Sequence, residues 1–154
     1  MIEKLPECRS VRVEFQEGWS QTAQKTLLAF ANTIGGDLYF GISDDGITKG
    51  LSKKAVNVIS RAVQEFCRSE VEPVLIDMVS TKVISVGNCR YVLRVTVEPG
   101  EDRPYALKGK RYTGGAYVRD GSMSVTATEE EWNWDVGAEF RISIKKPGLQ
   151  GLRP

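Results

Sequence analysis

Histidine is missing from this chain of 154 residues. A Ser-His-Asp triad, a Cys-His pair, a histidine zinc site and an imidazole general base are excluded, because each needs that side chain. Any chemistry that the chain performs must therefore rest on carboxylates, lysines, tyrosines, hydroxyls or thiols.

Cysteine is scarce, and long apolar runs are missing. The three cysteines, Cys8, Cys67 and Cys89, are odd in number and form no C-x-x-C pair, which disfavours a disulfide framework or a zinc ribbon and indicates a reducing compartment. No apolar run approaches the roughly 18 residues of a membrane span. The first eight residues carry two acids where a secretory signal has its apolar region. We therefore expect a cytoplasmic domain without membrane segments.

An excess of either charge is also missing, since 21 Lys and Arg face 20 Asp and Glu. A basic footprint for nucleic acid is not indicated by these totals and must come from segregation of charge on the surface. The apolar fraction of 41% and the charged fraction of 27% are ordinary for a globular protein. We expect one domain over residues 1–131, followed by an irregular C-terminal tail over 132–154.

Two short strands are predicted in the first third of the chain. Alternating apolar and polar residues over 11–16 predict a half-buried strand with Glu14 on its polar face. A continuous apolar run predicts a second strand over 38–42, which ends at an acidic turn. Neighbouring positions of these strands would bring their acids to one part of the sheet.

Helical spacing of apolar residues predicts helices over 20–34 and 52–67. Ser20 or Thr22 can cap the first helix, and Ser52 opens the second. Cys67 falls on the apolar stripe of the second helix and is interpreted as a small buried hydrophobe. The rest of that stripe comprises Ala55, Val58, Ile59, Ala62, Val63 and Phe66.

The second half of the chain returns to strand patterns. Alternation over 74–78 and 91–97, on either side of a turn at 87–88, predicts an antiparallel hairpin. A last strand is expected over 117–119, and a hydroxyl followed by acids over 128–131 predicts a helix start. This order of elements predicts an α/β (α+β) domain, in which two main helices pack on a mixed sheet.

Carboxylates are the first candidate functional groups. Glu14 lies on one predicted strand, and Asp44 and Asp45 lie in the turn after the other. If the strands are neighbours, the three acids converge and can hold Mg²⁺ or Mn²⁺, which would polarise a phosphodiester and activate a water. The alternative is structural, because Asp and Gly suit turns and Glu14 can form a solvated pair with Arg12.

A basic stretch is the second candidate. From Arg103 to Arg119 the chain carries five cations and no acid. Tyr105, Tyr112 and Tyr117 lie between these cations. This pattern suits a nucleic-acid backbone with stacked bases, although a solvated loop tolerates it too. The predicted nucleic-acid contacts are Arg103, Lys108, Lys110, Arg111, Tyr112 and Arg119.

Three blocks follow one another along the chain: Val13-Glu14-Phe15, then LLAFANTIGGDLYFGISDDGITKGL, then RPYALKGKRYTGGAYVRDGSMSVTATEEE. In this order they resemble the Schlafen AlbA_2 domain over roughly Arg9 to Glu131. That resemblance implies an α/β domain that binds nucleic acid, often as the N-terminal part of transcriptional regulators. In animal Schlafens it implies an endoribonuclease that cleaves tRNA and rRNA with an acidic cluster and a divalent cation.

The family's acidic residues carry over only in part. In the family these acids lie in a segment E-S-x-x-V-E-F-K and in the turn after the AFANT-GG strand. The second glutamate of the segment falls on Glu14, and the turn acid falls on Asp44 or Asp45. The position of the first glutamate is Arg9, and the lysine after the phenylalanine is Gln16. The resemblance therefore implies nucleic-acid binding more strongly than cleavage.

Three hypotheses follow. The first is a DNA- or RNA-binding domain that serves regulation or RNA handling and needs no cofactor to bind. The second is an endoribonuclease dependent on Mg²⁺ or Mn²⁺, with Glu14, Asp44 and Asp45 as catalytic residues and the metal on Glu14 and Asp44. The third is a protein-interaction module without nucleic-acid affinity. Because some Schlafens pair two lobes around a groove and this chain has one copy, we also expect a homodimer.

Overall fold

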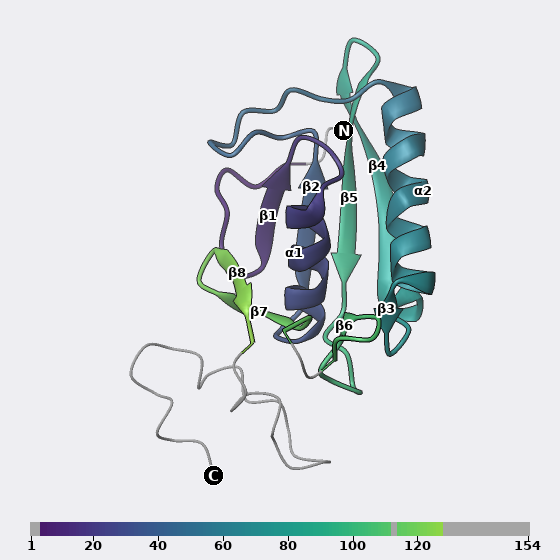
Figure 1. Cartoon of the computed structure of the whole chain (residues 1–154). Coiled ribbons are helices and arrows are strands. Elements are labelled where there is room, and N and C mark those ends of the chain that lie inside the picture. The colour runs from purple at the N-terminus through teal and green to yellow at the C-terminus, as the bar shows by residue number, and fades with distance from the viewer. Residues whose placement is uncertain (1–3, 112–113, 128–154) are drawn as a thin grey trace.

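The computed structural model describes residues 4–111 and 114–127 (Figure 1). Its two helices and its strands form a mixed α/β domain, so the predicted fold class is confirmed. In chain order the elements are β1 (Val13–Gln16), α1 (Gln21–Ala31), β2 (Gly36–Phe40), α2 (Lys53–Ser69), β3 (Val71–Glu72), the 3₁₀ turn η1 (Ile76–Met78), β4 (Val79–Gly87), β5 (Arg90–Val97), β6 (Ala106–Leu107), β7 (Tyr117–Asp120) and β8 (Met123–Thr126).

The main sheet has four strands in the order β1-β2-β5-β4. Strands β1 and β2 are parallel neighbours joined through α1, and the other pairs are antiparallel. Two small antiparallel sheets, β3-β6 and β7-β8, lie outside it. Because β1 is an edge strand of the main sheet, its outer side is open to side chains from other elements, and β7 supplies one of them.

Both predicted helices are confirmed, with the predicted serines as caps. Ser20 accepts a hydrogen bond from the backbone N–H of Ala23, and Ser52 accepts one from Ala55. These bonds satisfy N–H groups that have no partner within the helix. Helix α1 ends earlier than predicted, at Ala31, and the side chain of Asn32 then bonds the backbone of the distant Tyr105.

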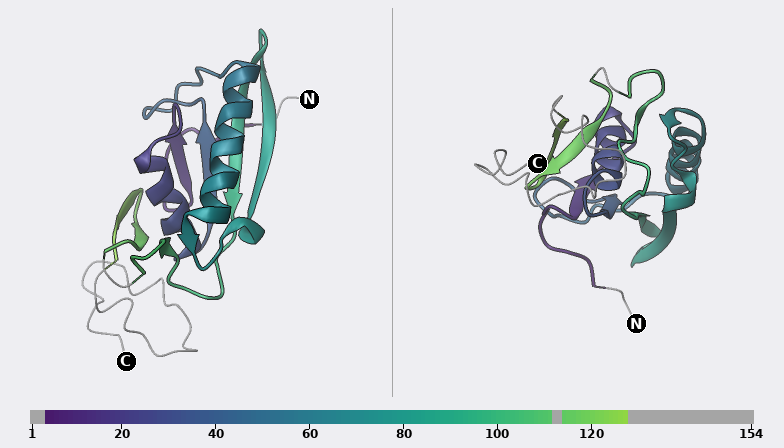
Figure 2. Two further views of the ribbon diagram at one scale, coloured as in Figure 1. Left: turned by 45° about the vertical axis from the view of Figure 1, so that its right-hand side comes forward. Right: turned by 90° about the horizontal axis from the view of Figure 1, so that it is seen from below.

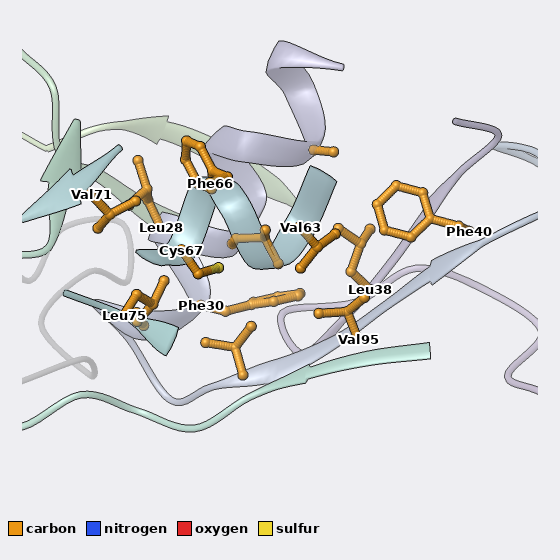
Figure 3. Close-up of a cluster of buried hydrophobic side chains, with 14 of the residues drawn as sticks. Leu28, Phe30, Leu38, Phe40, Val63, Phe66, Cys67, Val71, Leu75 and Val95 are labelled. Atoms are coloured by element: carbon orange, nitrogen blue, oxygen red, sulfur yellow. The ribbon is translucent and has the colours of Figure 1, made fainter. Parts of the chain in front are cut away.

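The helices cover one face of the main sheet and bury the larger apolar cluster against it (Figures 2 and 3). Cys67 lies in this cluster, and burial raises the pKa of its thiol to about 12, as expected for a buried hydrophobe. A smaller cluster around Phe15 lies on the opposite face, where Leu5 of the N-terminal segment packs on it. The predicted stripe of α2 is wrong at Val58, which is 60% exposed, because the buried face is centred elsewhere. That face comprises Val56, Ile59, Val63, Phe66 and Cys67.

The predicted hairpin is correct in its second strand and wrong in its first. Residues 74–78 contain the turn η1, in which the N–H of Met78 donates to the carbonyl of Leu75. The N–H of Leu75 donates to α2 at Cys67 instead of to a neighbouring strand. The first strand of the hairpin is therefore β4, which pairs with β5 along its whole length.

The C-terminal part of the chain also differs from expectation. The short strand near 117–119 exists as β7, and it pairs with an unpredicted strand, β8. The expected helix start at 128–131 and the tail over 132–154 lie outside the described residues. No helix in the described ranges is long and apolar enough to span a membrane.

Candidate functional site

A polar pocket of about 370 Å³ lies where β1, α1, the turn after β2 and the β7-β8 hairpin meet. We call it the Glu14 pocket. Its walls come from segments more than a hundred positions apart in the sequence, and Figure 1 shows β7 and β8 beside α1 and close to β1. Its lining residues are Arg9, Glu14, Gln16, Thr22, Lys25, Thr26, Asp44, Arg119, Ser122, Met123 and Ser124.

Glu14 is buried, although its place on the polar face of a strand predicted exposure. Only 3% of the residue is exposed. It lies opposite Leu38 in the register of β1 and β2, on the sheet face that packs against the helices. A carboxylate is stable there because the protein supplies charged hydrogen-bond donors.

Arg119 is the main donor to Glu14. Its Nη2 lies 3.0 Å from Glu14 Oε1, and its side chain is 1% exposed. The guanidinium carbon lies 5.0 Å from the centre of the Phe30 ring. Burial lowers the pKa of Arg119, and the Glu14 carboxylate opposes that shift.

The remaining donors of Arg119 are used within the protein. Its Nε donates to the carbonyl of Val11, and Nη2 donates to those of Ser10 and Val13. Its Nη1 donates to the hydroxyl of Ser124, at 3.0 Å. The predicted phosphate contact by Arg119 stays a prediction, but its geometry is that of a side chain that joins β1 to the β7-β8 hairpin.

Two other cations line the Glu14 pocket, Arg9 and Lys25, and neither was among the predicted nucleic-acid contacts. Arg9 Nη1 lies 3.4 Å from Glu14 Oε2, and its side chain is 38% exposed. Lys25 is exposed, with its Nζ 5.4 Å from the centre of the Tyr117 ring. The spacing of Thr22, Lys25 and Thr26 was the available signal, because residues three and four apart share one face of a helix.

The two acids of the turn after β2 have different surroundings. Asp44 lines the Glu14 pocket and is exposed. Asp45 accepts a short hydrogen bond from the Ser43 hydroxyl, and this bond is the main reason why the pKa of Asp45 lies below its ordinary value. The same hydroxyl accepts the N–H of Ile47, so Asp45 and Ser43 together hold the turn. This arrangement matches the structural alternative for Asp45.

The basic stretch is divided in the structure. Lys108 and Lys110 are exposed beside β6, which pairs with β3 near the end of α2, whereas Arg119 lies in the Glu14 pocket. Arg111 donates to the carbonyls of residues 102 and 104 and pairs with the Asp102 carboxylate at 3.6 Å. Arg103 donates to the carbonyl of residue 33.

The tyrosines of this stretch also differ. Tyr105 is only 3% exposed, so a base has no access to its ring. The predicted stacking is wrong at this residue. Tyr117 is half-buried below Lys25. Tyr112 lies outside the described residues.

The side chains that line the Glu14 pocket do not suit a divalent cation. Both carboxylate oxygens of Glu14 already take hydrogen bonds, Oε1 from Arg119 and Oε2 from Arg9 and Gln16. These guanidinium groups would also repel a metal ion at the same place. In residues 4–111 and 114–127 no group of three or more carboxylate or thiol side chains could hold a metal.

None of the curated proteins compared with the chain matches it. Residues 10–128 match the family described as Schlafen, AlbA_2, and this range includes Glu14, the turn after β2 and Arg119. Membership of this family suggests a nucleic-acid-related role. Since the match covers most of its length, the chain belongs to the Schlafen AlbA_2 family.

Proposed function

We propose that this domain binds nucleic acid, DNA or RNA, in regulation or RNA handling, with backbone phosphates at the rim of the Glu14 pocket. The observation that carries the proposal is the meeting of two accessible cations, Arg9 and Lys25, with the hydroxyls of Thr22, Ser122 and Ser124. Cations and hydroxyl donors are the groups that proteins most often present to a nucleic-acid backbone. Exposed Lys108 and Lys110 provide a second place for phosphates.

Salt dependence tests this proposal. Fluorescence anisotropy would measure the affinity for labelled single-stranded RNA, single-stranded DNA and duplex DNA over a series of salt concentrations. We expect the affinity to fall with salt, with a log–log slope of about 0.7–0.9 for each phosphate neutralised. Replacing Lys25 by Ala should reduce that slope by about 1, whereas Lys54→Ala at the exposed start of α2 should leave it unchanged.

Absence of binding at about 50 mM salt, where electrostatic binding is strong, would contradict the proposal. The interaction-module hypothesis would then be favoured. An unchanged salt slope in Lys25→Ala would place the phosphates elsewhere, and Lys108→Ala with Lys110→Ala would be the next variant to compare.

A metal-dependent endoribonuclease stays a prediction. Glu14 and Asp44 line the same pocket, which supports this alternative. The ion pairs of Glu14 with Arg9 and Arg119 oppose it. Incubation of tRNA with Mn²⁺ and either the original chain or Glu14→Gln decides the matter, because equal cleavage, or none by either, removes Glu14 from any mechanism.

The homodimer also stays a prediction. A second copy would add its own Arg9 and Lys25 to those of the first, and the two copies would form a two-lobed groove. Sedimentation at micromolar concentration, with and without a nucleic-acid ligand, would test it, and a monomer under both conditions would contradict it.

A further inference from the structure

We infer that the Glu14 pocket is an anion site that works without a divalent cation, because Arg9 and Arg119 already bond the carboxylate of Glu14. The inference deepens the proposed function, on which its ligand class, a nucleic-acid phosphate, rests. It is carried by the hydrogen bonds of Glu14 and by the charges that line the pocket.

The negative charge of Glu14 is neutralised from inside the protein. Arg119 bonds one carboxylate oxygen at 3.0 Å and is fixed by the carbonyls of Ser10, Val11 and Val13. A metal ion at Oε1 would have to displace a guanidinium whose side chain is 1% exposed, which would leave a buried charge without its partner. Glu14 therefore acts as the counter-charge of Arg119.

Arg9 neutralises the other side of the carboxylate. Its Nη1 lies 3.4 Å from Oε2, and the Gln16 amide lies 3.5 Å from the same oxygen. Unlike Arg119, Arg9 is partly exposed, with 38% of its side chain accessible. It can therefore bond Glu14 and an incoming phosphate together, because a guanidinium presents several donors in one plane.

The sum of charges in the pocket favours an anion. The charged residues that line it are Arg9, Lys25 and Arg119 against Glu14 and Asp44, so three positive charges less two negative ones leave +1. With Glu14 matched by Arg119, the open part of the pocket holds two cations and one carboxylate. A single phosphodiester carries the charge that balances this excess.

The size and the hydroxyls of the pocket define what it accepts. A volume of about 370 Å³ is near the lower end of the roughly 300–1,000 Å³ of ligand pockets. This space suits one phosphate with its sugar and excludes a duplex from the interior. Thr22 and Ser122 line the pocket with donors for phosphate oxygens, and Met123, which is 65% exposed, offers an apolar contact at the rim.

Reversal of one charge gives the sharpest experiment. In Arg9→Glu, a third carboxylate would stand beside those of Glu14 and Asp44, so the pocket would change from an anion site into an acidic site. We expect the original chain to bind inorganic phosphate by NMR titration, and Arg9→Glu to raise its Kd about tenfold or more. We expect Mn²⁺ binding, measured by water-proton relaxation, to be weak in the original chain and stronger in Arg9→Glu.

Arg9→Lys is the matched control, because it keeps the charge and should keep phosphate binding within about threefold of the original. Thermal unfolding of both variants shows whether they remain folded. If Arg9→Glu fails to fold, Asp44→Asn replaces it, since loss of this exposed acid should tighten phosphate binding and leave Mn²⁺ binding weak.

Three results would overturn the inference: no phosphate binding by the original chain, tight Mn²⁺ binding that Glu14→Gln removes, or nucleic-acid binding that disappears with a chelator. The last outcome leaves the proposed function intact, because nucleic acid still binds when metal is present. Absence of nucleic-acid binding together with retained phosphate binding would instead contradict the proposed function and the nucleic-acid ligand class, and the anion site without a divalent cation would stand.

Discussion

Arg119 and the segment 103–111 belong to one basic stretch of sequence but have opposite environments. Arg119 is buried against Phe30 and bonded to Glu14, and its donors are directed into the protein. Lys108 and Lys110 are exposed. A basic stretch of sequence therefore indicates a ligand-binding surface only when its cations are exposed. A cation that pairs with a buried acid and donates to several carbonyls stabilises the fold instead.

Arg111 lies between these two extremes. Its side chain is 28% exposed, and it bonds the carbonyls of residues 102 and 104 across its own loop. It holds the loop that presents Lys108 and Lys110. The basic stretch thus contains two kinds of cation, those that stabilise the domain and those that remain available to a ligand.

The largest expected effect is at Arg119. Arg119→Ala leaves Glu14 buried without its main partner and removes the link between β1 and the β7-β8 hairpin. We expect the free energy of unfolding to fall by about 3–5 kcal/mol, measured by urea denaturation. Lys110→Ala is the control and should change it by less than about 0.5 kcal/mol. A loss at Arg119 as small as that of the control would show that the buried pair does not hold the pocket together.

A smaller effect is expected within the segment 103–111. Arg111→Ala removes hydrogen bonds to two carbonyls, so the free energy of unfolding should fall by about 1 kcal/mol. Lys108→Ala should leave stability unchanged and lower the salt slope of nucleic-acid binding by about 1. If both substitutions changed the free energy of unfolding equally, the assignment of Arg111 to the fold and of Lys108 to ligand binding would be contradicted.

The smallest effect is expected at Asp45, an acid that is compared with its neighbour Asp44. The Ser43 hydrogen bond lowers the pKa of Asp45 in the folded state, so ionised Asp45 stabilises the fold above its unfolded pKa. This contribution is lost as the pH falls through the folded pKa. Asp45→Asn should therefore lower the melting temperature slightly at neutral pH and not in acid.

Asp44→Asn is the matched control, because it removes the neighbouring charge and leaves the Ser43 bond in place. A pH dependence shared by both variants would attribute the effect to the net charge of the turn. One confined to Asp45→Asn would attribute it to the hydrogen bond.

Local patterns predicted the elements that have local causes. The serine caps and the apolar spacing of α1 and α2 depend on residues three or four positions apart, and both helices were predicted. The strand expected over 74–78 was wrong because the N–H of Leu75 is engaged by α2, which no alternation in the sequence reveals. Val58 was assigned to the buried stripe because two adjacent sides of α2 carry apolar residues, and only the position of the sheet distinguishes them.

The candidate site was predicted in its acids and in one of its three cations, Arg119. Glu14 and Asp44 were selected from strand and turn patterns, and both line the pocket. Lys25 was missed, and Arg9 was noted only at the position of the family's first glutamate. Neither is recognisable as a pocket cation until β1, α1 and the β7-β8 hairpin are placed together.

The residue pattern was enough to exclude imidazole chemistry, to predict two capped helices on a mixed sheet, and to identify the Schlafen AlbA_2 blocks in order. Tertiary structure alone decided which charges are buried and which are accessible. The physical reason is that desolvation and ion pairing depend on distances between residues such as Glu14 and Arg119, which lie 105 positions apart in the chain and 3.0 Å apart in space.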